Sequence, residues 1–315
     1  MIKITSFNVN NLNFRTDKKI NDIAKLVSDS DIVVLQEVLN SNVIEGLSSS
    51  KKLTSFTNRL GNHWEGKWVN PQTRAKDYPY LGDEKRNEGY AYLWNTQKVE
   101  LLRDEEGNEI LPKRFSNYHV GEGQIRLKRD PGYGRFLVRN KKVEIRVITT
   151  HIIYGKPKDE NISVELDTGA INMRRDEFYL LSGKIYKYIN DHRKDININA
   201  VYTIIIGDYN LNLYGRYINA TIPPVCCFDS AGNLCSVGIN TMKTVQDELT
   251  TINKDGTGFA SNYDHCTYNV ELENKKVIRR CYRKLPVNEY DAQERIRAYR
   301  DTISDHLPIV IELNC

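Results

Sequence analysis

The chain has 315 residues, with 45 Lys and Arg against 41 Asp and Glu, which gives a formal net charge of +4. Hydrophobic residues make up 40% of it and charged residues 27%, a balance that excludes a disordered chain and a collagen-like one. No apolar run approaches the roughly 18 residues that a membrane span needs, and so small a net charge does not by itself indicate nucleic acid or membrane as a partner.

Seven short apolar runs predict β-strands, because they are rich in β-branched and aromatic residues and are bounded by polar or glycine-containing turns. In chain order they are Ile2–Val9, Asp31–Val38, Gly89–Trp94, Val143–Thr150, Val201–Ile206, Cys266–Val270 and His306–Leu313. The second and fifth runs are apolar without alternation, so we expect these strands to be buried on both faces.

Apolar residues at spacings of three and four predict two helices. The first follows Thr16, which can cap it, and carries Ile20, Ile23, Ala24 and Val27; the second spans Ile171–Ile189. The polar segments Ser41–Arg86 and Leu211–Asn262 are predicted to be surface loops. Since no linker or internal repeat divides the chain, we expect one domain, residues 1–315, with helices packed on internal sheets.

The amino-terminal residues resemble a strand and not a signal peptide, so we expect a cytoplasmic protein, with a secreted mature form as the alternative. Six cysteines form no CxxC pair, which argues against a zinc ribbon: Cys226, Cys227, Cys235, Cys266, Cys281 and Cys315. Free thiols are the expectation for all six. The clustered Cys226, Cys227 and Cys235 could instead form a bridge or bind metal.

Polar residues stand at the ends of the predicted strands. In chain order they are Asn8, Asn10, Glu37, Glu88, His151, Asp208, Asn210, Asp264, Asp305 and His306. If the strands share sheets, these carboxylates, amides and imidazoles meet at one rim. Oxygen ligands suit a hard divalent cation, and imidazoles suit proton transfer at phosphorus near neutral pH. Each residue alone has a plain structural explanation, such as a turn, a cap or a core histidine, but their joint order indicates a site.

The ordered motifs resemble those of the endonuclease/exonuclease/phosphatase superfamily, which includes deoxyribonuclease I. They are SFNVN from Ser6, LQE ending at Glu37, EGY from Glu88, TTH ending at His151, GDYN from Gly207, YDH from Tyr263 and SDHLP from Ser304. The match runs from Asn8 to His306. The resemblance implies an α/β (α+β) fold, a four-layered α/β/β/α sandwich in which two mainly antiparallel β-sheets pack face to face between helices.

The resemblance also implies roles for the strand-end residues. Glu37 corresponds to the main metal-binding glutamate, with Asn8 and Asp305 beside it; Mg²⁺ is the expected ion, with Mn²⁺ or Ca²⁺ as alternatives. Asp208 and Asn210 correspond to the pair that orients the attacking water and binds the scissile phosphate. The two catalytic histidines correspond to His306, paired with Asp264, and His151, paired with Glu88. Either Arg129 or Arg135 is expected to contact a phosphate.

His151 favours the branch that contains deoxyribonuclease I, sphingomyelinases and inositol phosphatases, because abasic-site endonucleases generally lack a histidine there. Leu39 and Asn10 stand where deoxyribonuclease I has minor-groove arginines, and its disulfide cysteine after GDYN has no equivalent, so that mode of duplex binding is not expected. The remaining histidines, His63, His119, His192 and His265, are expected to be structural or solvated.

The long loops are polar and basic and contain aromatic residues, which suits stacking on bases. The basic positions are Lys51, Lys52, Arg74, Lys76, Lys85, Arg86 and the segment Arg126–Arg139, and the aromatic positions are Trp64, Trp68, Tyr78, Tyr80 and Tyr133. We therefore expect a monomeric, metal-dependent endonuclease whose substrate is nucleic acid, DNA rather than RNA. The alternative is a phosphoesterase that acts on phospholipid, as sphingomyelinases do, or on inositol phosphate. A non-catalytic binding module is disfavoured, because every polar position of the site carries a competent residue.

Overall fold

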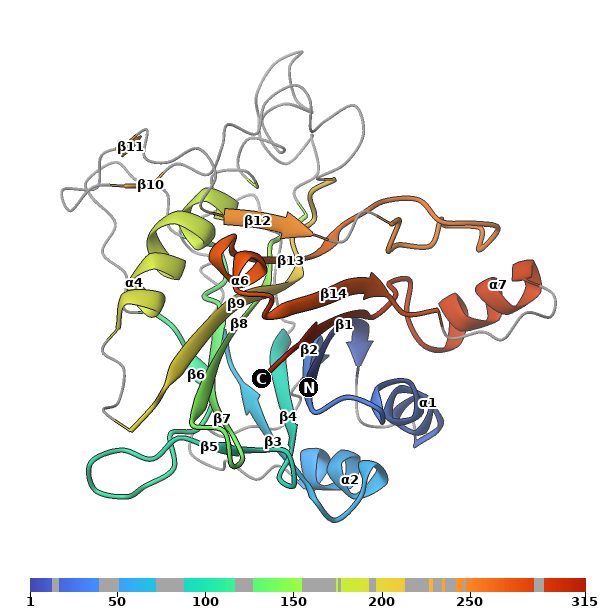
Figure 1. Ribbon diagram of the computed structural model, residues 1–315. Helices are drawn as coiled ribbons and strands as arrows, with labels where there is room; N and C mark the ends of the chain where they lie inside the picture. Colours follow the sequence, from blue (N-terminus) through green and yellow to red (C-terminus); the bar gives the residue numbers. More distant parts are fainter. Residues whose placement is uncertain are drawn as a thin grey trace.

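The computed structural model describes residues 1–12, 17–39, 51–71, 88–116, 127–154, 174, 177–192, 197–212, 227–228, 234–235, 242–245, 248–285 and 292–315. Two β-sheets form its centre (Figure 1). The first has the strand order β14-β15-β1-β2-β4-β3. Its strands are β1 (Ile2–Leu12), β2 (Ile32–Leu39), β3 (Trp64–Val69), β4 (Glu88–Asn95), β14 (Ile278–Arg283) and β15 (Ile309–Leu313). β1 and β2 are parallel, and the other neighbours are antiparallel.

The second sheet has the order β12-β13-β9-β8-β7-β5, and β6 also pairs with β7. Its strands are β5 (Val99–Leu101), β6 (Lys113–Arg114), β7 (Gly132–Val138), β8 (Val143–His151), β9 (Ala200–Asp208), β12 (Met242–Val245) and β13 (Asp264–Asn269). β8 and β9 are parallel. A separate hairpin of β10 (Cys227–Phe228) and β11 (Leu234–Cys235) sets the backbones of Cys227 and Cys235 opposite each other.

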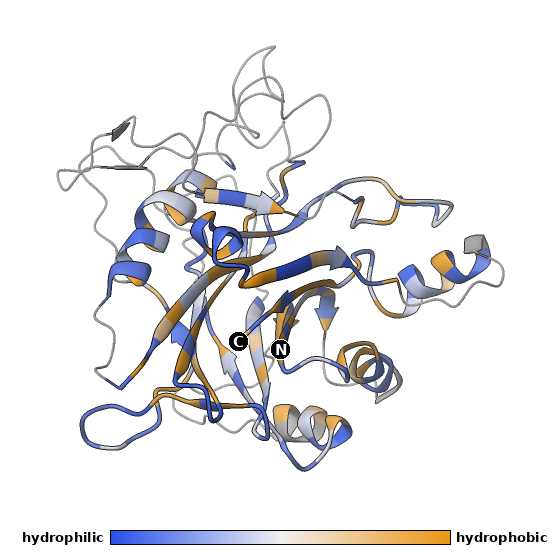
Figure 2. Cartoon of the chain, in the orientation of Figure 1, coloured by the Kyte–Doolittle hydropathy of each residue, from blue (hydrophilic) through white to orange (hydrophobic). Residues whose placement is uncertain are grey.

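Helices cover the outer faces of both sheets. α1 (Asp17–Val27) and α2 (Lys51–Leu60) lie on the first sheet, and Tyr299 of α7 (Ala292–Thr302) joins the same apolar cluster. The π-helix η3 (Leu180–Ile185) and α4 (Tyr186–Asp191) lie on the second, and α6 (Glu271–Asn274) precedes β14. A third cluster fills the space between the sheets, and apolar residues follow the strands accordingly (Figure 2). The predicted four-layered sandwich is therefore confirmed. Among the described residues, no helix combines the length and apolarity needed to cross a membrane.

Every predicted strand is present, but the last begins at Ile309 and not at His306, which forms an isolated bridge with Thr251. The two unalternating strands are buried on both faces as predicted, since Val33 packs toward α1 and Val34 toward the second sheet. Both helices are also present where described; Thr16, the expected cap, lies outside the described residues.

The prediction that Ser41–Arg86 is a surface loop was wrong for its middle part, which forms α2 and β3. Leu53 and Phe56 of α2 and Trp64 of β3 are buried in the outer cluster on the first sheet. β7 and β14 were missed as well, because their arginines mask the strand pattern, and β12 lies within the other predicted loop. Cys266, Cys281 and Cys315 are free, as predicted.

Candidate active site

The polar strand ends meet because of how the strands are paired. Parallel pairing of β1 with β2 brings Asn8 and Glu37 to the same edge of the first sheet. Parallel pairing of β8 with β9 sets His151 opposite Asp208, and antiparallel β13 begins there with Asp264 opposite Asp208. Residues distant in sequence therefore share one end of the sandwich.

A β-bulge turns the Glu37 side chain toward this end. Leu35 pairs with Ala91 and Val38 with Gly89, so two residues of β2, Gln36 and Glu37, oppose a single residue of β4. Glu37 adopts a left-handed backbone with φ 57°, a conformation that costs a non-glycine residue on the order of 1–3 kcal/mol and that concentrates at functional sites. The bulge thus lowers the stability of the fold locally and, in return, directs the Glu37 carboxylate toward the site.

The backbone after β1 holds that carboxylate. Asn10 and Asn11 are also left-handed, with φ 44° and 54°. The Asn11 N–H donates to Glu37 Oε2 at 2.9 Å, and Asn8 Nδ2 donates to Glu37 Oε1 at 3.0 Å. The Asn10 N–H donates in turn to Asn8 Oδ1 at 3.0 Å. Asn8 therefore turns its amide nitrogen, and not its oxygen, toward Glu37.

Asp208 lies at the centre of the arrangement and is 1% exposed. Its Oδ2 accepts hydrogen bonds from Asn8 Nδ2 at 3.0 Å and Asn210 Nδ2 at 3.3 Å. The same oxygen lies 3.6 Å from His151 Nε2 and 3.7 Å from His306 Nε2. Burial raises the pKa of Asp208 to about 7, the charge of Asp264 adds to this, and His306 opposes it. One carboxylate thus stands between two imidazoles and can exchange a proton near neutral pH.

His306 forms the pair with Asp264 that the sequence predicted: Nδ1 lies 2.9 Å from Asp264 Oδ2. Although burial alone would lower it, the carboxylates of Asp264 and Asp208 hold the pKa of His306 well above its usual value. Ser304 ties this loop to β1, since its hydroxyl donates to the Asn8 carbonyl at 2.7 Å and accepts from the His306 N–H at 3.1 Å. The two carboxylates therefore favour the protonated form of His306, and the hydrogen bond to Asp264 fixes its orientation.

His151 contacts Arg129, which lies between it and Glu88, the carboxylate expected to be its partner. Arg129 Nη1 lies 2.6 Å from His151 Nδ1, and Arg129 Nη2 lies 2.5 Å from Glu88 Oε2. Glu88 Oε2 is 4.0 Å from the same imidazole nitrogen. A guanidinium presents several donors in one plane, so it bridges the two acceptors.

This contact assigns the tautomer of His151. Because a guanidinium only donates, Nδ1 accepts and the ring proton sits on Nε2, which faces Asp208 and lies 3.7 Å from Glu37 Oε1. Burial, together with the charges of Arg129 and His306, lowers the pKa of His151 well below its usual value. The pKa values of the two histidines are thus shifted in opposite directions.

Arg135, the alternative phosphate contact, lies elsewhere. It pairs with Glu144 at 2.7 Å and lines a pocket on the flank of the second sheet with Tyr188 and His192. On β7, Arg135 lies opposite the middle of β8, so its side chain is away from the strand ends that form the site. Of the two arginines that the sequence left open, Arg129 is the one that reaches the site.

Sequence reasoning missed Lys19, whose place in an apolar helical pattern carried no signal. Its Nζ donates to the Asn10 carbonyl at 2.9 Å, behind the turn that holds Glu37. Burial lowers the pKa of Lys19, while the carboxylates of Glu37 and Asp305 oppose that shift. The Lys19 ammonium group thus interacts electrostatically with both carboxylates that are expected to bind metal.

The donor set fits a hard cation. Each oxygen of Glu37 accepts one hydrogen bond from the described residues, so lone pairs remain for an ion, and Asp305 adds a second, partly exposed carboxylate to the same acidic region. A second group could also hold a metal: Asp208, Asp264 and His306 offer ligand atoms within 4.8 Å of one another. In it, Asp264 Oδ1 is buried and accepts no hydrogen bond from any described residue.

The other residues singled out from the sequence have structural surroundings or are not described. His265 is fully buried, and its Nε2 lies 2.8 Å from the Asn262 carbonyl and 2.9 Å from that of Leu211. Trp64 and Tyr133 are buried in apolar clusters. Arg74, Lys76, Tyr78, Tyr80, Lys85, Arg86, His119 and Cys226 lie outside the described residues.

Comparison with known proteins identifies the family. The model of the endonuclease/exonuclease/phosphatase family matches residues 5–228. A comparison with curated proteins gave no match.

Three solved structures share the fold. A family member from Bacteroides thetaiotaomicron has a TM-score of 0.57 and 17% identity, covering 99% of this chain and 94% of its own. A mannosyl-6-phosphatase from Bacteroides thetaiotaomicron VPI-5482 has 0.55 and 16%, with complete coverage of both chains. Truncated Caenorhabditis elegans TDP2 has 0.52 and 14%, covering 100% and 97%. The chain therefore belongs to the endonuclease/exonuclease/phosphatase family, whose members are phosphoester hydrolases.

Proposed function

We propose that the protein is a Mg²⁺-dependent phosphodiesterase that cleaves nucleic acid as an endonuclease, with DNA preferred over RNA. The observation that carries this proposal is the pair of imidazoles on either side of one buried carboxylate. His151 Nε2 and His306 Nε2 lie 3.6 Å and 3.7 Å from Asp208 Oδ2, and their pKa values are shifted in opposite directions. Asp208 between them has a pKa raised to about 7, so it suits a base, and His306 suits an acid in the same displacement.

The residues then divide the work. Asp208, with a pKa of about 7, takes the proton of the attacking water, which Asn210 helps to orient. His306, held by Asp264, stabilises the charge that develops on the phosphate or gives a proton to the departing oxygen. His151 donates from Nε2 to a phosphate oxygen, because Arg129 occupies its other nitrogen.

Glu37 and Asp305 would hold the metal, with Asn8 orienting Glu37. A bound Mg²⁺ supplies positive charge against the phosphate oxygens. The Glu37 carboxylate is already held in position by the Asn8 amide. The same amide nitrogen also donates to Asp208, so it positions both carboxylates.

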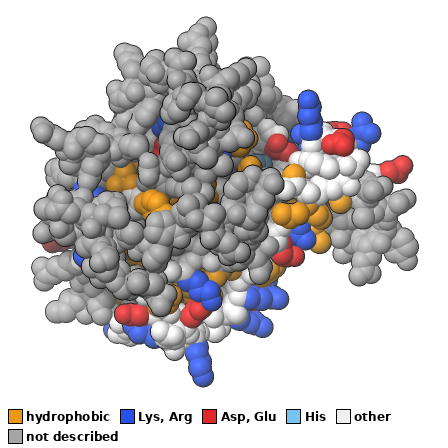
Figure 3. Space-filling model, turned by 90° about the horizontal axis from the view of Figure 1, so that it is seen from above, with side chains coloured by type: hydrophobic (Ala, Val, Ile, Leu, Met, Phe, Trp, Pro, Cys, Tyr) orange, Lys and Arg blue, Asp and Glu red, His pale blue; other side chains and the backbone are white. Residues whose placement is uncertain are grey.

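Nucleic acid is favoured over lipid by the polar, basic composition of the long loops. On the face seen from above, described acidic and basic side chains lie close together, with apolar ones between (Figure 3). Charge on that part of the surface therefore does not select a polyanion, and the choice rests on the site and the loops. Phospholipid, inositol phosphate and, from the mannosyl-6-phosphatase neighbour, sugar phosphate are the competing substrates.

A substrate panel tests the proposal. Supercoiled plasmid, single-stranded DNA, RNA, sphingomyelin, an inositol phosphate and mannose 6-phosphate are incubated with the protein in Mg²⁺ or in chelator. We expect Mg²⁺-dependent nicking of plasmid, lost in His306→Ala and kept in the matched control His63→Ala. Turnover of a lipid or sugar phosphate without cleavage of any nucleic acid would overturn the nuclease assignment but keep the phosphoesterase site.

A further inference from the structure

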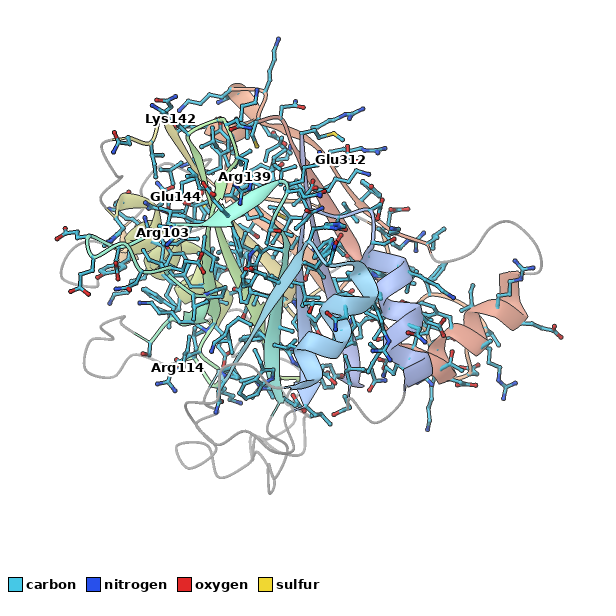
Figure 4. The ribbon with its side chains drawn as sticks, turned by 90° about the horizontal axis from the view of Figure 1, so that it is seen from below. Arg103, Arg114, Arg139, Lys142, Glu144 and Glu312 are labelled. Atoms are coloured by element: carbon cyan, nitrogen blue, oxygen red, sulfur yellow. The ribbon has the colours of Figure 1, made fainter. Side chains whose placement is uncertain are left out.

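A pocket of about 860 Å³ lies on the flank of the sandwich, between the edge strand β3 of the first sheet, strands β6 and β7 of the second, and α4. Its size is that of sites for small organic molecules. Arg114, one of its lining residues, is labelled in Figure 4 on the flank opposite α1, α2 and α7. We call it the β6 pocket. Of the residues proposed for the site from the sequence, Arg135 is the one that lines it.

The β6 pocket is positively charged. Its lining carries four cations, Lys67, Lys113, Arg114 and Arg135, against the single carboxylate of Asp104. Two of the cations have acidic partners: Arg135 lies 2.7 Å from Glu144, and Arg114 lies 3.8 Å from Asp130.

Lys67 and Lys113 are the cations left over, since neither forms an ion pair with any residue that the structure describes. The pKa of His192, which also lines the pocket, reflects this excess charge. Burial lowers it most, the charges of Arg135 and Arg146 lower it further, and Glu144 opposes the shift. The charge of the lining therefore favours an anionic ligand.

The β6 pocket also has an aromatic wall. Phe115 lies edge-on to Tyr133, with ring centroids 6.0 Å apart, and 5.6 Å from the ring of Tyr188. Tyr188 is 50% exposed and Leu111 is 42% exposed, although both line the pocket. Exposed ring and aliphatic surface beside ammonium groups that form no ion pair with a described residue suits a molecule with a flat apolar part and an anionic part.

We propose that the β6 pocket binds a nucleotide, with phosphate at Lys67 and Lys113 and the base against Tyr188 and Leu111. Ammonium groups bind phosphate as point charges, and bases stack on exposed rings without regard to sequence. The nucleotide is either free or one unit of a strand, and the two share this chemistry. The proposal rests on the pocket alone and does not depend on the reaction at the strand ends.

Equilibrium titration with AMP and with pentathymidylate tests it, in chelator so that no strand is cleaved. Lys67→Met/Lys113→Met should bind both probes at least about 10-fold more weakly, with a shallower dependence on salt, because two phosphate contacts are lost. Tyr188→Ala should weaken both by about 5-fold or more, as loss of one stacking contact does. Lys141→Met, which removes an exposed lysine outside the pocket, is the matched control and should bind as the wild type does.

Binding of AMP by the double variant at wild-type strength would overturn the proposal. So would unchanged binding by Tyr188→Ala, since the base would then play no part. Lys113→Glu, at an exposed position, repeats the charge test should the double variant fold poorly. Much tighter binding of pentathymidylate than of AMP identifies a strand, and equal binding a free nucleotide. Hydrolysis of bis(p-nitrophenyl) phosphate by the lysine variants should equal that of the wild type, which separates failure here from failure of the proposed function.

Discussion

Replacing Arg129 by methionine removes the guanidinium that lies between Glu88 and His151. Arg129 is 7% exposed and the Glu88 side chain 13%, and their contact is 2.5 Å, so the pair is buried and little screened by solvent. Removing one partner of a buried pair leaves an uncompensated charge, which typically costs about 3–5 kcal/mol. We expect Arg129→Met to lower the free energy of unfolding by that amount.

Glu88→Gln should cost less, because the amide oxygen can still accept from Arg129, which also contacts His151. The double variant Arg129→Met/Glu88→Gln has no buried carboxylate left unpaired. Its loss should therefore fall below the sum of the single losses by about 0.5–3 kcal/mol, the usual range for residues in direct contact. Urea unfolding of the four proteins, read by fluorescence, gives this double-mutant cycle.

Arg129→Met should also change His151. Without the guanidinium, the nearest charge to Nδ1 is the Glu88 carboxylate at 4.0 Å, so the pKa of His151 should rise from its depressed value. NMR of the imidazole nitrogens follows this directly. Additive losses in the cycle, together with an unchanged His151 titration, would refute the bridging role of Arg129.

Glu37→Gln should abolish hydrolysis at low Mg²⁺ and regain part of it in excess Mg²⁺, because the amide keeps the shape but loses the charge; full turnover at low Mg²⁺ would contradict the metal assignment. His151→Ala and His306→Ala should each lower the rate by about 10²–10⁴, and the double variant by much less than the product, measured on plasmid. Gly207→Ala should destabilise the fold by about 1–3 kcal/mol in urea unfolding, since a Cβ there would lie 2.1 Å from a carbonyl oxygen of β8. Burial would raise the pKa of Glu144, but hydrogen bonds from two arginines hold it below 4.5. The stability that ionised Glu144 gives the folded protein is therefore present above pH 4.5 and is lost as the pH falls through the folded-state pKa. The urea midpoints of wild type and Glu144→Gln should then converge on acidification.

The sequence alone determined the features that are local or ordered along the chain. Apolar runs such as Ile32–Leu35 predict strands buried on both faces, because every side chain in them is apolar and is more stable away from water. The order of LQE, GDYN and SDHLP identified the family, since those motifs stand at strand ends that the fold brings together.

Other features follow from register and side-chain direction, which local sequence does not carry. Arg129 and Arg135 look equivalent in sequence, but Arg135 sits on β7, where alternation turns it to the flank and Glu144 holds it. The bulge at Glu37 arises from pairing between β2 and β4 and leaves no sequence signal.

Tertiary packing decided the rest. α2 and β3 are stabilised because Phe56 and Trp64 are buried in the apolar cluster on the first sheet. The local sequence is polar and does not predict that burial. Glu88 lies 4.0 Å from His151, and Arg129 fills that gap with donors that bridge both groups. Which residue touches which is set by contacts between strands far apart in sequence, and only the folded chain brings those strands together.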